Sequence, residues 1–118
     1  MQKAKVFFTK TITPESLMNI YKALGRELHG KVAVKISTGE PGGHNFLQPS
    51  LIAPLVQKLQ GTIVECNTAY EGRRNTSEAH WQTFKDHGFA AIASCDLMDE
   101  EGELILPVRN GRQLKENY

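Results

Sequence analysis

Short apolar runs alternate with amphipathic stretches along this chain. The apolar runs are rich in β-branched and aromatic side chains, which predicts strands at residues 4–9, 31–36, 62–66 and 90–95. Apolar positions with helical spacing predict helices over residues 14–29, 49–61 and 77–87. Repeated β-α-β order favours a mostly parallel sheet with right-handed crossovers. We therefore predict an α/β fold, a Rossmann-like three-layer arrangement with helices on both faces of the sheet.

The ends of the predicted helices carry specific signals. Thr13 fits the N-cap position, because a proline follows it at the first helical position. Asn75 or Thr76 is expected to cap the third helix. Pro54 lacks a backbone donor, so the second helix is expected to start late or to kink.

The apolar positions also predict the core. Because the strands are nearly continuous in apolar residues, the sheet should be covered on both faces. The strand residues expected to be buried are Phe7, Val34, Ile36, Ile63, Val64 and Ile92. The residues expected to cover them are Leu55, Trp81 and Phe84.

The C-terminal segment predicts a β-hairpin. Asn110-Gly111 is a favoured two-residue turn between residues 103–108 and 113–118. If the chain ends before its terminal strand meets a neighbour, that strand has an unpaired edge, and such edges pair with other chains. We therefore expect self-association through the edge of this C-terminal hairpin.

Composition limits the class of protein. With 118 residues, 40% of them hydrophobic, the chain is expected to form a single domain over residues 1–118. The formal charge of +1 argues against broad electrostatic binding to nucleic acid or to a membrane surface. Cys66 and Cys95 lie far apart without a CxxC pattern, so reduced thiols in a cytoplasmic protein are expected. We expect neither a signal peptide nor a membrane span, because the apolar runs are too short.

The most informative segment is residues 67–76, which directly follows a predicted strand and precedes a predicted helix. Open α/β sheets bind ligands at such loops, outside the carboxyl ends of the strands. Two adjacent arginines here offer planar guanidinium forks suited to a carboxylate or a phosphate. The predicted ligand-binding residues in this loop are Asn67, Thr68, Tyr70, Arg73 and Arg74.

An alternative interpretation of the two arginines stays open. One of them would pair with Glu65, Glu71 or Glu78, and the other would be solvated. The loop would then be only a connection between a strand and a helix.

A second glycine-rich loop, residues 37–45, follows the second predicted strand. Backbone N–H groups at Gly39, Gly42 and Gly43 could cradle an anion, although the loop matches neither standard phosphate-binding glycine pattern. The alternative is a tight connection in which glycine and proline serve the backbone dihedrals.

Two side chains are candidates for proton transfer, namely Glu40 in this loop and His80 in the third predicted helix. The alternative for His80 is a structural hydrogen-bonding role beside an apolar face. His80 and His87 are two helical turns apart, about 10.5 Å along the axis, which is too far for one metal ion. No metal site is predicted.

Four stretches carry a family resemblance: Val34-Lys35-Ile36-Ser37-Thr38-Gly39-Glu40-Pro41-Gly42, Leu47-Gln48-Pro49, Glu65-Cys66-Asn67-Thr68-Ala69-Tyr70-Glu71-Gly72-Arg73-Arg74-Asn75, and His80 with His87-Gly88-Phe89. With this order from residue 5 to 118, the chain resembles the domain of unknown function 362 family. Members of that family are often described as uncharacterised iron–sulfur centre proteins, and frequently continue into a ferredoxin-like region with cysteine clusters. The resemblance implies that this chain is an N-terminal portion, with [4Fe–4S] clusters in the full-length protein; the alternative is a naturally short member of the family. Two separated cysteines cannot supply the four thiolates of such a cluster, so no cofactor is expected in this chain.

Three classes of function follow. The first is the ligand-binding portion of an iron–sulfur-associated protein, holding a small anionic ligand between residues 39–45 and 67–76. The second is a non-catalytic module that docks a redox partner or the missing half of its own domain. An RNA- or nucleotide-binding domain is disfavoured by the near-neutral charge and the few aromatic residues. The sequence leaves open whether the site is catalytic.

Overall fold

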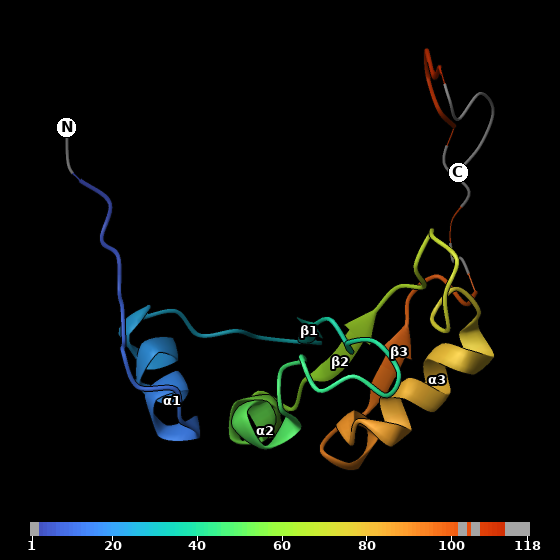
Figure 1. Cartoon of the computed structure of the whole chain (residues 1–118). Coiled ribbons are helices and arrows are strands. Elements are labelled where there is room, and N and C mark those ends of the chain that lie inside the picture. The colour runs from blue at the N-terminus through green and yellow to red at the C-terminus, as the bar shows by residue number, and fades with distance from the viewer. Residues whose placement is uncertain (1–2, 102–103, 105–106, 113–118) are drawn as a thin grey trace.

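The computed structural model describes residues 3–101, 104 and 107–112. Its elements in chain order are α1 (Pro14–Ala23), β1 (Ala33–Lys35), α2 (Pro49–Lys58), β2 (Thr62–Glu65), α3 (Ser77–Asp86), the 3-10 helix η1 (Phe89–Ala91) and β3 (Cys95–Leu97) (Figure 1). The strands form one parallel sheet in the order β1-β2-β3. The predicted α/β class and parallel sheet are confirmed. No helix in the described part of the chain is long and apolar enough to cross a membrane.

The layers of the molecule follow from this strand order. Ile63 lies in register with Val34 and Cys95, and all three pack with the apolar residues of α2 and α3. Both helices lie on the same side of the sheet (Figure 1). Right-handed crossovers that advance in one direction across a sheet place their helices on one side. The layering therefore differs from the expected three layers with helices on both faces. On the opposite face Lys35 and Asp96 are exposed.

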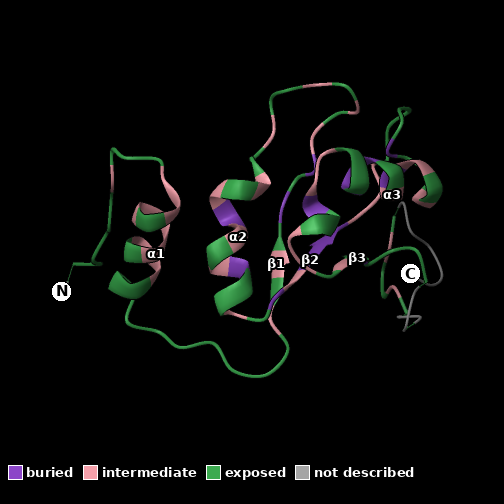
Figure 2. Ribbon diagram, turned by 90° about the horizontal axis from the view of Figure 1, so that it is seen from below, coloured by how far each residue is buried: buried purple, intermediate pink, exposed green. Residues whose placement is uncertain are grey.

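The core lies between the sheet and these helices (Figure 2). Its buried apolar residues are Ile36, Ile52, Val56, Ile63, Phe84, Phe89 and Leu97. Burial of one such side chain contributes about 1.5–3 kcal/mol. Of the predicted core, Ile36, Ile63, Val64 and Phe84 are buried, whereas Val34, Leu55, Trp81 and Ile92 are partly buried.

The predicted strand at residues 4–9 does not form. Val6, Phe7 and Phe8 are 87%, 43% and 81% exposed, so the burial expected for Phe7 is wrong. This segment leads into α1, which packs against α2 and not on the sheet, and it extends away from the strands (Figure 1). An apolar pattern predicts a strand only where a sheet edge is within reach, and here none is.

The helix ends agree with capping chemistry. The Thr13 hydroxyl accepts from the Ser16 N–H at 3.2 Å, and the Ser16 hydroxyl accepts from the Thr13 N–H at 3.1 Å. Thr76 caps α3. The first helix ends at Ala23, before the predicted residue 29, and Gly25 follows with a φ of +61°. That left-handed position halts the helix early.

The fourth predicted strand forms later in the chain than expected. Gly88 has a φ of +83°, and η1 then replaces the first half of the strand predicted at residues 90–95. The strand forms later, at Cys95–Leu97, where Leu97 reaches the core.

The predicted hairpin lies mostly outside the described residues. Of its turn, Asn110 has a φ of +59°, which is the left-handed region that such turns use.

Candidate functional site

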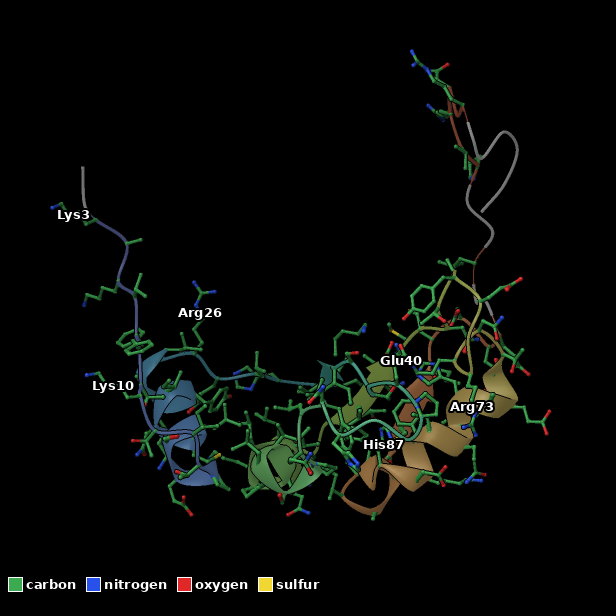
Figure 3. All side chains as sticks on the ribbon, in the orientation of Figure 1. Lys3, Lys10, Arg26, Glu40, Arg73 and His87 are labelled. Carbon is green, nitrogen blue, oxygen red and sulfur yellow. The ribbon has the colours of Figure 1, made fainter. Side chains whose placement is uncertain are left out.

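Two loops and one helix meet at the carboxyl edge of the sheet. The loops of residues 37–45 and 67–76 follow β1 and β2, and α3 begins directly after the second loop. Figure 3 shows Glu40, Arg73 and His87 together beside α3, far from Lys3 and Lys10 on the N-terminal segment. Parallel strands bring their carboxyl ends to one edge, which is why loops separated in sequence converge here.

Glu65, the last residue of β2, is buried at the base of this edge. Its carboxylate accepts from the backbone N–H groups of Thr38 and Cys66, both at 3.0 Å. The Lys35 ammonium donates to it at 3.4 Å. Burial disfavours the charged carboxylate, but these donors outweigh that cost and hold the pKa of Glu65 below its ordinary value. Glu65 is therefore a fixed negative charge.

Arg74 lies over Glu65 and is only 6% exposed. Its Nη1 donates to Glu65 Oε1 at 3.2 Å and to Thr38 Oγ1 at 3.4 Å. Its Nη2 donates to Glu40 and, at 2.9 Å, to the Tyr70 hydroxyl. Burial disfavours the charged guanidinium, but the contact with Glu40 outweighs it and raises the pKa of Arg74. Arg74 Nε, which is buried, has no hydrogen-bond partner among the described residues.

Glu40 and Tyr70 form the outer layer of the site. The Tyr70 hydroxyl donates to Glu40 Oε1 at 2.9 Å, the oxygen that also receives Arg74 Nη2. Hydrogen bonds from Arg74 and Tyr70 lower the pKa of Glu40. Both outer side chains are largely exposed, whereas Glu65 and Arg74 beneath them are buried. The site thus has a rigid interior and an accessible exterior.

His80, on α3, closes the back of the site and is fully buried. Its Nδ1 lies 3.2 Å from Asn67 Oδ1, and its Nε2 lies 2.9 Å from Thr38 Oγ1. With the Asn67 amide donating to Ser77 Oγ at 3.0 Å, Nδ1 carries the proton and Nε2 accepts from the Thr38 hydroxyl. Burial lowers the pKa of His80, so the imidazole is neutral near pH 7.

His87 has a supporting role at the end of α3. Its Nδ1 donates to the Thr38 carbonyl at 2.7 Å, and its ring stacks on Phe46 at a centroid distance of 3.9 Å. Both contacts hold the loop of residues 37–45 against α3.

The remaining predicted residues lie at the margin. Arg73 is exposed and lines a shallow cleft of about 270 Å³ beside α3, with its side chain apart from Arg74. Thr68 shapes its own loop, because its N–H donates to the Arg74 carbonyl at 2.9 Å and its hydroxyl to the Tyr70 carbonyl at 3.3 Å. The structure thus unites Arg74 with Glu65 and exposes Arg73, as the alternative interpretation of the arginines expects. It also brings Glu40 to Arg74, which that alternative does not include.

The three predicted glycines shape the turn around Glu40. Gly39 and Gly42 have φ values of +79° and +76°, and the Gly43 N–H donates to the Glu40 carbonyl at 2.9 Å. A glycine is required at Gly39 on two grounds, because an added Cβ would also lie 2.5 Å from Phe46 Cβ. The prediction that these N–H groups cradle an anion stays a prediction.

Thr38 and Glu65 are central to the network, and sequence reasoning gave them no site role. Glu65 entered only as one possible partner of an arginine. The available signal was a carboxylate within the near-continuous apolar run of β2, directly before the loop. A charged group in such a strand is buried only when it is paired, and here its partners come from Thr38 and Arg74.

The described cysteines are free thiols. Cys66 and Cys95 are both partly buried, and burial raises the pKa of Cys95 to about 11. That thiol is therefore protonated near pH 7. The described residues hold no group of three or more His, Cys, Asp or Glu side chains placed to bind a metal ion.

A known family covers the part of the chain that holds this network. The family model described as "Domain of unknown function (DUF362)" matches residues 32–118, which is most of the chain. The chain belongs to this family. The DUF362 match begins just before β1 and includes every residue of the buried network, whereas α1 lies outside it. No curated protein and no solved structure matches the chain.

Proposed function

We propose that this DUF362 chain binds a small anionic ligand at the carboxyl edge of its sheet, with Arg74 as the charged anchor. The observation that carries the proposal is the environment of the guanidinium. Glu65 fixes it from the buried side, while its Nη2 donates, within the described part of the chain, only to the exposed side chains of Glu40 and Tyr70. An arginine that is fixed before binding loses little conformational entropy when a ligand arrives.

The residues around Arg74 have different roles in this proposal. Asn67 and Thr68 position the loop, and Arg73 adds positive charge at the rim. Of the two proton-transfer candidates, Glu40 has the exposure needed to reach a ligand. His80 is fully buried behind Thr38, so any proton it exchanges would pass through the Thr38 hydroxyl.

The proposal predicts unequal effects of substituting the two arginines. Arg74→Lys keeps the charge that compensates Glu65 but removes the planar fork. A charge-assisted hydrogen bond contributes about 1.5–3 kcal/mol, so this variant should bind acetate or phosphate at least about tenfold more weakly. Arg73→Ala should change the affinity by less than about threefold, because exposed charges contribute little. Isothermal titration calorimetry measures both.

Thermal melting of each variant shows whether its fold is retained. Equal anion affinities for Arg74→Lys and the parent chain would contradict Arg74 as the anchor.

The second candidate function is a non-catalytic module that docks a redox partner or another part of its own domain. The observation that favours it is the exposure of Val6, Phe8 and Ile12 at 87%, 81% and 82%. Apolar side chains gathered on one exposed segment are typical of interaction sites. The iron–sulfur association and the cytoplasmic setting are part of the same proposal. An iron assay and a visible absorption spectrum of the protein purified from cells test the association.

A further inference from the structure

We infer that the ligand of this site is a monocarboxylate, and that Glu40 occupies the ligand's position until the ligand displaces it. This inference rests on the proposed function above, because it names the ligand class of the same site. Glu40 would then act as an internal competitor that keeps Arg74 paired in the empty protein.

The first support is a subsite already shaped for a carboxylate oxygen. Glu40 Oε1 receives two donors, Arg74 Nη2 and the Tyr70 hydroxyl, the latter at 2.9 Å. The Glu40 side chain is 57% exposed, whereas that of Arg74 is 7% exposed. The carboxylate can therefore leave this pair, and the guanidinium cannot. An incoming carboxylate would meet the same two donors.

The second support is the unused donor of Arg74. Nε and Nη2 form one edge of the guanidinium, the edge that binds a carboxylate through two parallel hydrogen bonds. Glu40 engages only Nη2, and the buried Nε has no partner among the described residues. A ligand that is not tethered to the loop can place one oxygen on each nitrogen. It would satisfy a donor that Glu40 leaves unpaired.

The third support is the balance of charge. Arg74 already pairs with buried Glu65 through Nη1 at 3.2 Å, and Lys35 contacts Glu65 from the other side at 3.4 Å. Displacing Glu40 removes one negative charge from this cluster, and binding of a monoanion returns the net charge to its former value. A phosphate dianion would bring a second negative charge close to Glu65, and no further cation among the described residues contacts Arg74 to offset it. The site therefore selects a carboxylate over phosphate.

The surroundings of the Glu40 side chain allow this exchange. A Cβ at Gly42 would meet nothing within 4 Å, so open space lies beside this turn. The Gly43 N–H bond to the Glu40 carbonyl and the Phe46–His87 stack hold the loop backbone, so the exchange needs only a rotation of the exposed Glu40 side chain away from Arg74.

The test compares Glu40→Ala with the parent 118-residue chain, using sodium acetate and inorganic phosphate as probes in calorimetric titrations. Removing an internal competitor should strengthen acetate binding by about tenfold, since the pairing that acetate must break is gone. Acetate should bind both proteins more tightly than phosphate does. Glu71→Ala is the matched control, because Glu71 is an exposed glutamate on the neighbouring loop, and it should bind acetate like the parent.

A second readout keeps the outcomes distinct. The NMR signal of the Arg74 Nε–H in Glu40→Ala should shift downfield on acetate addition as that donor gains an acceptor. Acetate binding that is unchanged or weaker in Glu40→Ala, or tighter binding of phosphate than of acetate to the parent chain, would overturn the inference while leaving an anion site in place. Absence of binding of either anion to both proteins would overturn the proposed function itself.

Discussion

Burial and ion pairing fix the Arg74 guanidinium before any ligand arrives. A buried ion pair pays a desolvation cost comparable to its Coulomb attraction, so the pair with Glu65 is weak support for stability. Its effect on geometry is greater. Four different side chains accept from the two Nη groups, and they come from the loops of residues 37–45 and 67–76 and from the end of β2. The arginine therefore has one orientation, with a single edge left for a ligand.

At the same scale, His80 gives the fold a pH dependence. Burial holds the pKa of His80 below its ordinary value of 6.5, so the unfolded chain takes up a proton before the folded protein does. The stability contributed by neutral His80 is fully present above the unfolded pKa of 6.5, and it is lost as the pH falls through the lower pKa of the folded protein. His80→Gln should flatten the fall in the free energy of unfolding between about pH 7 and pH 5.

Urea denaturation across this pH range measures the effect. His44→Gln is the matched control, because His44 is an exposed histidine outside the buried network. The same slope in the parent and in His80→Gln would show that His80 is not the group responsible.

At the scale of elements, capping signals were more reliable guides than apolar runs. Thr13, Thr76 and Gly88 mark the ends of helices as predicted, because each acts through contacts within a few residues. The strand predicted at residues 4–9 required a partner edge elsewhere, and no local pattern encodes that. The strand predicted at 90–95 moved to Cys95–Leu97 because Gly88 directs the chain into η1 first.

The loop of residues 37–45 offers a paired test at this scale. Gly39→Ala and Gly42→Ala both place a side chain at a left-handed φ, which costs about 1–2 kcal/mol each. Gly39→Ala adds a clash with Phe46, whereas a Cβ at Gly42 meets open space. Gly39→Ala should therefore lower the free energy of unfolding by about 1–3 kcal/mol more than Gly42→Ala does. Equal losses in urea denaturation would mean that the Phe46 contact relaxes without cost.

At the scale of the whole molecule, parallel topology explains how far the site could be predicted. Glu40, Arg74 and His80 were expected to share one edge, because the carboxyl ends of β1 and β2 lie side by side. The sequence did not show which of Arg73 and Arg74 is buried, because side chains in a loop do not alternate between a buried and an exposed face at a regular spacing. The roles of Thr38 and Glu65 depend on contacts between segments that are distant in sequence, with each other across 27 positions and between Thr38 and His80 across 42.

A competing location for an anion also exists at this scale. A cleft of about 740 Å³ lies at the C-terminal ends of α1 and α2, beside residues 25–30, and includes Lys22, Arg26 and Lys58. Its cations lie on exposed surface and are screened by salt, whereas Arg74 is buried. The cleft is therefore the weaker candidate, although it is larger.

The most direct measurement of the central claim is a ¹H–¹⁵N NMR titration of the parent chain with sodium acetate. It locates the bound anion without any substitution. The account predicts that the largest shifts occur at Thr38, Tyr70 and Arg74, around the Nε–Nη2 edge of the guanidinium. Shifts centred on Lys22, Arg26 and Lys58, or a spectrum that acetate leaves unchanged, would contradict it.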